Sequence, residues 1–239
     1  MEEGSLADWY APASEPPSGY YGGGEVNSGI ADTVATGEQA HTGSQSAALT
    51  ITTPPEAGTR LFRWQEPQQN REAYYSAWFF VPQSYEVLSW WNMFQFKSVK
   101  SVDAASTTTD PFWYIVLQDT PLGGLRPEMH WWAELPVEGP HQGEFGFKIY
   151  QPLTPVTIPI EQWFKLECFL RQSNAFDGRL ACWLDSTKIF DFTNVKTGYE
   201  RCTYNAWCVD NHWSVNNYSS GLLPGVATIF VDDASIAKP

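Results

Sequence analysis

Side chains that donate hydrogen bonds or exchange protons alternate with apolar side chains along three segments of the chain. The first segment is residues 90–98, in which two phenylalanines lie on one face and Trp91, Gln95 and Lys97 lie on the other. Alternation with a period of two residues is typical of a β-strand that is buried on one side. An amide and an amine beside a tryptophan suit the lining of a polar groove; an exposed strand face is the simpler alternative.

The same pattern recurs in residues 128–135 and 212–218. In both segments one face is apolar, and the other carries aromatic side chains together with imidazole, carboxylate or amide groups. The residues of these polar faces are Glu128, His130, Trp132, His212, Ser214, Asn216 and Tyr218. Three strands of this kind, placed side by side in one concave sheet, would form a cleft.

These groups suit the β-elimination of a uronic acid chain. That reaction requires neutralisation of a carboxylate, removal of the neighbouring proton and protonation of the leaving oxygen. Arg63 and Gln95 are candidates for the first role, through charge-assisted hydrogen bonds. Tyr218 is a candidate for both proton transfers if Lys97 or an arginine lowers its pKa from the ordinary value of about 10.

Other roles for the same residues remain open. His130 or His212 is an alternative base whose pKa needs little adjustment. For Tyr218 the alternative is a purely binding role, because a tyrosine in a groove is commonly a platform for a sugar ring. Glu128 and Glu134 are too far apart along one strand to flank a single glycosidic bond, which makes glycoside hydrolysis the third choice.

The aromatic content points to a sugar ligand. The chain has 12 Trp, 11 Tyr and 14 Phe among 239 residues. A core explains the phenylalanines, whereas an excess of Trp and Tyr provides flat amphipathic surfaces on which pyranose rings stack. We therefore expect a polysaccharide or an oligosaccharide as the partner of a chain that acts as a monomer.

The charge balance argues against nucleic acid and anionic membranes as partners. With 14 basic and 27 acidic residues, a net charge of −13, the chain is not expected to bind nucleic acid or an anionic membrane surface. An anionic polysaccharide would need the few basic residues gathered in one cleft. No run of eighteen apolar residues occurs, so no segment is expected to span a membrane.

The elements that must position these groups are short strands. Segments with a period of two residues are separated by turn residues, and no stretch of twelve residues has a helical period. The expected strands are residues 47–53, 60–66, 74–81, 90–98, 112–118, 128–135, 145–150, 161–171, 179–185, 188–192, 212–218 and 227–236. Residues 1–30, rich in Gly, Ser and Pro, are expected to be loop. This pattern predicts one all-β domain over residues 1–239, a two-sheet antiparallel β-sandwich or jelly roll with a concave groove.

The four cysteines favour an exported, oxidised protein. Cys202 and Cys208 are spaced for a short disulfide, whereas Cys168 and Cys182 fall at similar depths in one expected hairpin and suit either a bridge or buried thiols. No C-x-x-C pair occurs, so zinc is not expected. The chain opens without a basic and apolar leader, so a secretory signal is expected to be absent or already removed.

Three segments resemble the ends of concanavalin A-like jelly rolls that bind or cleave polysaccharides. They are Glu2-x-Gly4-x-Leu6-x-Asp8-Trp9, His41-Thr42-Gly43-Ser44-Gln45-Ser46 and Ile229-Phe230-Val231-Asp232-Asp233-Ala234-Ser235-Ile236. The resemblance implies a structural calcium ion held by Glu2, Ser44 through its carbonyl, and Asp232. Oxygen ligands from distant segments suit a hard cation and would tie both ends of the chain to one sheet. Met1 stands where that family usually has an aromatic residue.

The middle of the chain resembles the alginate, glucuronan and heparin lyase-like jelly rolls of the same superfamily. Phe94-Gln95-Phe96-Lys97 is similar to their Gln-x-His strand, with Lys97 in the place of the histidine. Arg60-x-x-Arg63-x-x-Glu66 is similar to their Arg- and Glu-rich strand, and Ser214-Val215-Asn216-Asn217-Tyr218 to the late strand that ends in the catalytic tyrosine.

The sequence therefore predicts a secreted, polysaccharide-active protein, most specifically a lyase that cleaves a uronic-acid-containing glycan. The candidates for catalysis are Tyr218, Lys97, Gln95, His130 and Arg63. The candidates for substrate binding are Trp91, Trp132, Asn216, His212 and Glu128. The alternative is a non-catalytic carbohydrate-binding module, for which aromatic platforms and the calcium ion suffice.

Overall fold

The computed structural model describes residues 2–10, 22–64, 71–101, 107–133, 146–173, 175–198 and 209–239. The elements are α1 (Ala7–Tyr10), β1 (Gly22–Ser28), β2 (Ile30–Thr36), β3 (Ser46–Thr52), β4 (Ala57–Trp64), β5 (Glu72–Phe80), β6 (Glu86–Val87), β7 (Trp91–Ser101), β8 (Thr107–Asp119), β9 (Leu125–Ala133), β10 (Gly146–Tyr150), β11 (Trp163–Arg171), β12 (Gly178–Leu184), β13 (Thr187–Val195), β14 (Val209–Ser219), β15 (Leu222–Leu223) and β16 (Val226–Ala237). Within these ranges no helix has the length and apolar character needed to cross a membrane.

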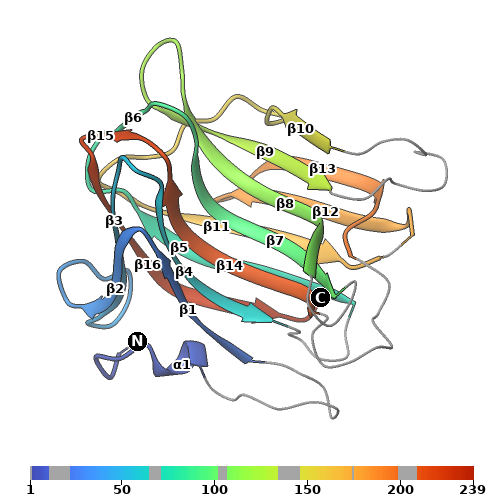
Figure 1. Ribbon diagram of the computed structural model, residues 1–239, viewed down its shortest axis with the longest axis horizontal. Helices are drawn as coiled ribbons and strands as arrows, with labels where there is room; N and C mark the ends of the chain where they lie inside the picture. Colours follow the sequence, from blue (N-terminus) through green and yellow to red (C-terminus); the bar gives the residue numbers. More distant parts are fainter. Residues whose placement is uncertain are drawn as a thin grey trace.

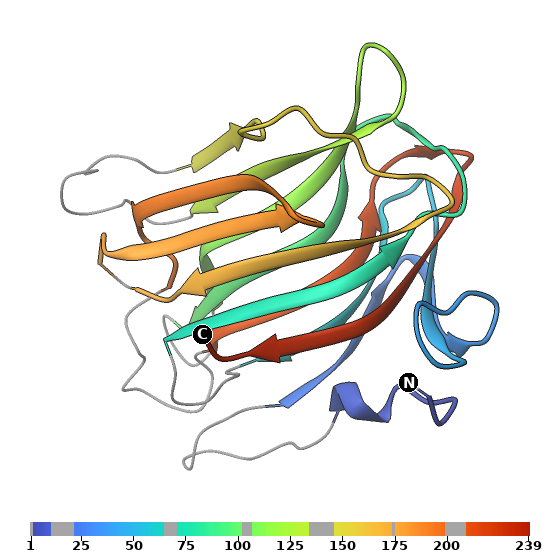
Figure 2. The ribbon, with the colours of Figure 1, turned by 180° about the vertical axis from the view of Figure 1, so that it is seen from behind.

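Two seven-stranded antiparallel sheets pack face to face. The first has the strand order β1-β4-β14-β7-β8-β9-β10, and the second has the order β13-β12-β11-β5-β16-β3-β2. Figure 1 shows the first sheet in front, and Figure 2 shows the second. Neighbours such as β4 and β14 are far apart in the sequence, as in a jelly roll. The all-β, two-sheet sandwich predicted from the strand pattern is confirmed.

The core lies between the sheets and consists of the inward-facing residue of each alternating pair. Phe94 of the first sheet packs against Phe79 of the second with ring centroids 6.3 Å apart, and both side chains are buried. Burying one such side chain contributes about 1.5–3 kcal/mol. The period-two alternation of the expected strands predicts that Phe94, Phe96, Trp131, Leu135, Leu166 and Val215 face the core. The structure describes five of these residues, Phe94, Phe96, Trp131, Leu166 and Val215, and all five are buried. Leu135, also expected there, lies outside the described residues.

One amide side chain joins the two sheets inside the core. Asn217 of β14 is fully buried, and its Nδ2 donates hydrogen bonds to the carbonyl oxygens of Leu49 (2.8 Å) and Ala227 (2.9 Å), which belong to β3 and β16. Its Oδ1 accepts a hydrogen bond of 2.8 Å from Nε1 of Trp91. Both ends of the amide are therefore satisfied, which removes most of the cost of burying it.

A disulfide bond joins Cys168 and Cys182 across the β11–β12 hairpin. The two residues are direct cross-strand partners, both are fully buried, and their Cα atoms are 4.1 Å apart. The structure therefore has a bridge where the spacing left a bridge and two thiols as alternatives. Cys202 and Cys208 lie outside the described residues.

The expectation of a loop throughout residues 1–30 is wrong. Residues 7–10 form α1, and β1 pairs with β4 along its whole length. A Cβ atom at Gly23 would lie 2.1 Å from the carbonyl oxygen of Trp9 and 2.3 Å from that of Phe62. Glycine here permits close contact between a strand and its neighbours, so the run of glycines marks a crowded strand and not a loop.

Candidate functional site

The face of the first sheet that points away from the core carries most of the candidate residues. We refer to this set of side chains, contributed by five adjacent strands, as the polar face. Its members are Arg60, Asn92, Gln95, Lys97, Phe112, Tyr114, Arg126, Glu128, His130, Trp132, Ser214, Asn216 and Tyr218. It is the side of the sandwich on which the expected groove would lie.

The centre of the polar face is a row of direct cross-strand neighbours. Ser214 pairs with Gln95, Gln95 with Tyr114, and Tyr114 with His130. Cβ atoms of such partners are about 4.5–5.5 Å apart. The rings of Tyr114 and His130 have centroids 5.3 Å apart. A hydroxyl, an amide, a phenol and an imidazole therefore lie in one line across four strands.

Gln95 is fixed in place, and its amide nitrogen is left without a hydrogen-bond partner in the described part of the chain. Its Oε1 accepts a hydrogen bond of 3.1 Å from Asn92, whose own Oδ1 accepts one of 2.9 Å from Asn216. Gln95 is only 2% exposed, and its Nε2 has no hydrogen-bond partner among the described residues. A buried donor left unpaired costs about 1–3 kcal/mol. An acceptor atom of a ligand would remove that cost.

Lys97 lies two residues beyond Gln95 on the same face, about 7 Å along the strand. Burial, together with the positive charge of Arg60, lowers the pKa of Lys97 from 10.5 to about 8. Burial also lowers the pKa of Arg60, although Tyr218 and Glu56 oppose the effect, and the Arg60 Nε has no partner in the described part of the chain. Two cations on one face of the sheet, in a chain with an excess of acidic residues, favour an anionic ligand on this face.

Tyr114 and Arg60 were not among the candidates identified from the sequence. The alternation of residues 112–118 contained the signal for Tyr114, because Trp113 and Ile115 are the core residues of that strand. Burial raises the pKa of Tyr114 to about 12, so its hydroxyl keeps its proton at neutral pH. The ring of Phe112 stacks on that of Tyr114 with centroids 4.2 Å apart, which holds the phenol in place.

Tyr218 belongs to the polar face and pairs directly with Asn92, the residue that bonds Gln95, but it lies far from Lys97. Lys97 pairs with His212, six residues before Tyr218 on β14, a distance of roughly 20 Å along the strand. The expected lowering of the Tyr218 pKa is not found: burial and the carboxylate of Glu56, to which its hydroxyl donates, raise the pKa to about 12. The guanidinium of Arg60 lies 4.7 Å from the ring centroid and only partly opposes this rise.

Glu128 and His130 form a hydrogen-bonded pair that is buried in the polar face. Glu128 Oε2 and His130 Nε2 are 3.2 Å apart, and Glu128 Oε1 accepts hydrogen bonds from Arg126 (2.8 Å) and Gln151 (2.7 Å). Burial alone would raise the pKa of Glu128, but the bonds from Gln151 and His130 and the charge of Arg126 lower it. Burial lowers the pKa of His130 despite the nearby carboxylate, so the imidazole is neutral at pH 7.

The expected place of Trp91 in the groove is wrong. Trp91 is fully buried in the core, where it donates a hydrogen bond to Asn217. The reason is a β-bulge at Met93: the pairing of β7 with β8 skips from Asn92 to Phe94. The extra residue shifts the alternation by one, so Trp91 and Met93 face the core before the bulge and Phe94 does so after it.

The expected place of Arg63 in the groove is also wrong. Arg63 faces the other side of β4 and is 8% exposed, with Nη1 donating to the carbonyl oxygens of Asp8 (3.4 Å) and Trp9 (2.9 Å). It therefore binds helix α1 to the sheet. Arg60, three residues earlier and on the opposite face of the strand, is the arginine that the polar face contains.

Three further candidates lie on or next to the polar face. Asn216 is fully buried and belongs to the network that fixes Gln95. Trp132 is partly exposed. It lies two residues after His130 on β9, the strand between β8 and β10. The backbone of His212 pairs with Lys97, and its side chain lies outside the described part of the structure.

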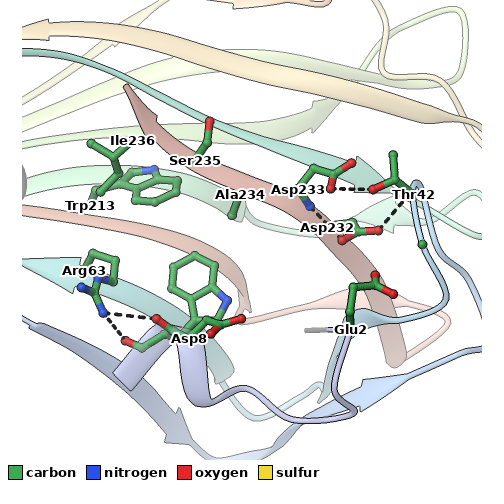
Figure 3. Close-up of a pocket in the computed structure, with 12 residues that line it drawn as sticks. Glu2, Asp8, Thr42, Arg63, Trp213, Asp232, Asp233, Ala234, Ser235 and Ile236 are labelled. Carbon is green, nitrogen blue, oxygen red and sulfur yellow. Dashed lines mark hydrogen bonds between the residues drawn. The ribbon is translucent and has the colours of Figure 1, made fainter. Parts of the chain in front are cut away.

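Glu2 and Asp232, two of the three residues expected to bind calcium, line a cavity of about 450 Å³ at a different place, between α1, the β2–β3 turn and β16. Figure 3 shows Glu2, Asp232 and Asp233 at one end of it and Arg63 and Trp213 at the other. Glu2 Oε2 accepts hydrogen bonds from the backbone nitrogen (2.7 Å) and the hydroxyl (3.2 Å) of Ser44.

The buried carboxylate of Asp232 holds the β2–β3 turn against β16. Its Oδ2 accepts hydrogen bonds from the backbone nitrogens of His41 (2.9 Å) and Thr42 (3.3 Å). The described residues contain no group of three or more His, Cys, Asp or Glu side chains arranged to hold a metal. A calcium ion here would therefore depend on the two carboxylates together with backbone carbonyls and water.

Comparison with known proteins shows which solved structures share this fold. The chain matches no protein-family model and no curated protein sequence. An endo-β-1,4-glucuronan lyase from the fungus Trichoderma reesei superposes with a TM-score of 0.66 over 95% of this chain and 96% of the lyase, at 13% identity. The chain shares the fold of polysaccharide lyases. An alginate lyase from a Chlorella virus superposes with a TM-score of 0.63 over 93% of this chain and 93% of the lyase, at 10% identity.

A variant of a further alginate lyase, solved with an alginate trisaccharide bound, covers 81% of this chain and 82% of its own with a TM-score of 0.54 and 13% identity. These matches confirm the jelly-roll resemblance that the sequence motifs indicated. At such low identity the likeness concerns the lyase fold alone, and one fold supports many activities. The residues of the polar face therefore determine which activity the fold supports here.

Proposed function

We propose that the protein is a polysaccharide lyase that cleaves a uronic-acid-containing glycan by β-elimination on the polar face. One observation carries the proposal: Lys97, with its lowered pKa, lies beside the unpaired amide of Gln95 and the protonated phenol of Tyr114. These are a base, a carboxylate-binding donor and an acid, placed within the span of one or two sugar rings.

Arg60 and Gln95 are suited to hold the substrate carboxylate. The reaction places extra negative charge on that carboxylate as the neighbouring proton leaves, so fixed donors stabilise the transition state more than the ground state. The unpaired Nε2 of Gln95 supplies one such donor and the guanidinium of Arg60 supplies positive charge. Gln95 is already fixed by Asn92, so little side-chain entropy is lost on binding.

Lys97 and Tyr114 are suited to the two proton transfers. The proton on C5 of the uronate passes to Nζ of Lys97, and its electron pair forms the C4–C5 double bond as the C4–oxygen bond breaks. The leaving oxygen takes the phenolic proton of Tyr114. The resulting phenolate then recovers a proton from the Lys97 ammonium, which is favourable because the pKa of Lys97, about 8, lies below that of Tyr114, about 12.

His130 is the alternative base, and Glu128 is proposed to position it. The hydrogen bond to Glu128 engages Nε2 of His130 and leaves Nδ1 as the free acceptor when the imidazole is neutral. Glu128 is itself held by Arg126 and Gln151, so it is a fixed partner and not a mobile acid. This arrangement makes Glu128 a positioning residue, in place of the substrate-binding role expected from the sequence.

We propose in addition that calcium binds between Glu2 and Asp232 and that the protein is exported. Glu2 and Asp232 line one cavity, and a calcium ion there would join the N-terminal segment to β16 without entering the reaction. The buried Cys168–Cys182 bridge supports an oxidising compartment, because cytosolic proteins rarely keep such bonds.

The test is incubation with a panel of polyuronates and neutral glycans, following ultraviolet absorbance of unsaturated products and the release of reducing ends. Elimination gives both signals, whereas hydrolysis gives reducing ends alone. An increase in ultraviolet absorbance is expected with at least one polyuronate. If Gln95→Ala abolishes this increase without changing the melting temperature, the reaction takes place on the polar face. If no polyuronate gives an absorbance increase and the protein binds a neutral glycan, the carbohydrate-binding module is the function that remains.

A further inference from the structure

The outward face of the second sheet carries aromatic side chains where an exposed sheet face usually carries polar ones. Tyr74 of β5 contacts Phe169 of β11 and Trp183 of β12, with ring centroids 5.2 Å and 6.3 Å apart. Tyr74 and Trp183 are partly exposed. We refer to Tyr74, Phe169 and Trp183 as the outer aromatic patch. Figure 2 shows the three strands on the side of the sandwich that faces the viewer.

The charged side chains that border the outer aromatic patch are paired with one another. Asp191 accepts hydrogen bonds from Arg179 Nε and Nη2, both 3.0 Å, and from Lys188 Nζ at 2.9 Å. The guanidinium of Arg179 lies 5.9 Å from the ring centroid of Phe169, and the amine of Lys188 lies 5.4 Å from that of Trp183. The patch therefore offers aromatic rings bordered by two cations that share one carboxylate.

Aliphatic side chains larger than alanine are absent from the outward positions of β5, β11 and β12 in the described structure. Those positions hold Glu72, Tyr74, Ser76, Trp78, Phe80, Trp163, Lys165, Glu167, Phe169, Arg171, Arg179, Ala181 and Trp183. Protein interfaces are likewise enriched in aromatic residues and Arg, but the core of an interface is depleted of charged residues. Aromatic faces bordered by charged pairs instead match a pyranose ring, which has a flat apolar face and hydroxyl groups around its edge.

We propose that the outer aromatic patch is a second, non-catalytic site that binds a neutral polysaccharide on the side of the sandwich opposite the polar face. Arg179 and Lys188 are both held by Asp191 and lie against the rings of Phe169 and Trp183, so their donors are already engaged and a neutral chain is the ligand proposed. The site would hold the protein on a neutral glycan matrix and leave the polar face open. This inference does not depend on whether the polar face is catalytic.

Native gel electrophoresis through hydroxyethylcellulose, mixed-linkage β-glucan or glucomannan tests the site. The wild-type protein should be retarded by at least one of the three polymers. Trp183→Ala and Tyr74→Ala should each weaken that binding by roughly fivefold or more, because each removes a stacking surface. Tyr74→Phe should retain binding, and elimination activity on a polyuronate should be unchanged in all three variants, because these residues lie on the other sheet.

Trp132→Ala is the matched control, since it makes the same change on the polar face. It should leave retardation by the neutral polymer intact. Loss of retardation in Trp132→Ala with normal binding in Trp183→Ala would overturn the proposal, as would a wild-type protein that none of the polymers retards. A dimer that Trp183→Ala dissociates in sedimentation would show that the patch binds a second copy instead. Tyr74→Ala provides the independent result if Trp183→Ala does not fold.

Discussion

At the scale of single residues, the lowered pKa of Lys97 gives the proposed reaction a definite pH dependence. Only the neutral amine accepts a proton, so kcat/KM should rise with pH and level off above about 8. Lys97→Met should lower turnover by roughly 10²–10⁴-fold, the usual effect of losing an acid or base. The measurement is the absorbance of unsaturated product. Lys165→Met, which removes a lysine paired with Glu167 on the other sheet, should have no such effect.

The lowered pKa of Lys97 also predicts how the free energy of unfolding varies with pH. Between about pH 8 and 10.5 the folded Lys97 has lost its proton while the unfolded one retains it, so the free energy of unfolding should increase across this window. Denaturant titrations at several pH values would show the increase in the wild type. It should be smaller in Lys97→Met, and an equal slope in both proteins would contradict the burial of this amine.

The two tyrosines of the polar face should differ sharply in their effect on turnover. Tyr114→Phe removes the proposed acid and should lower turnover by roughly 10²–10⁴-fold while glycan affinity persists. Tyr218→Phe removes a hydroxyl that is bonded to Glu56 at the far end of the face, and should change mainly affinity. Kinetics and calorimetry on both variants separate these roles. The reverse order of effects would return the catalytic role to Tyr218.

At the scale of the strands, period-two alternation predicted most elements and failed where a strand departs from regular pairing. It placed Gln95 and Lys97 correctly relative to Phe94, because that stretch of β7 is regular. It misplaced Trp91 because the bulge at Met93 leaves no signal in the pattern of residue types. Arg63 and Arg60 lie on opposite faces, and only the pairing with β14 shows which of them joins the other candidates.

The hairpin of β11 and β12 should depend on its disulfide. The bridge closes a segment with a sequence separation of 14, for which the loss of unfolded-state entropy predicts about 3 kcal/mol of stabilisation. Replacing Cys168 and Cys182 by alanine should lower the free energy of unfolding by about 2–3 kcal/mol in urea titrations. Activity below the new melting transition should persist, since the bridge lies in the sheet opposite the polar face. An unchanged midpoint would contradict the prediction.

The turn between β2 and β3 gives the calcium proposal its test. A chelator should lower the melting temperature by several degrees, because an ion that binds only the folded chain stabilises it. Asp232→Asn should remove the response, and Asp32→Asn, on the exposed side of β2, should not. Asp233 is unsuitable as a control, because a bulge in β16 brings it to the same cavity, where it binds His41 and Thr42. No shift in the wild type would remove the site.

At the scale of the whole molecule, the net charge of −13 opposes the approach of a polyuronate. Raising the ionic strength from about 10 mM to about 150 mM shortens the Debye length from about 30 Å to about 8 Å and screens this repulsion. The KM for a polyuronate should therefore fall over this range, while retardation by a neutral glycan stays constant. A KM that rises steadily instead would mean that local attraction by Lys97 and Arg60 dominates the encounter.

The hydrogen bonds of Asn217 determine how far one sheet can slide over the other. Apolar layers interdigitate almost equally well at several offsets, but the donors of this amide meet the carbonyl oxygens of Leu49 and Ala227 at a single one. The core can therefore exchange one aromatic residue for another of similar volume and keep its alignment. A change of Asn217 to leucine would keep a branched side chain of similar shape but lose the hydrogen bonds, and with them the fixed relation between the two faces.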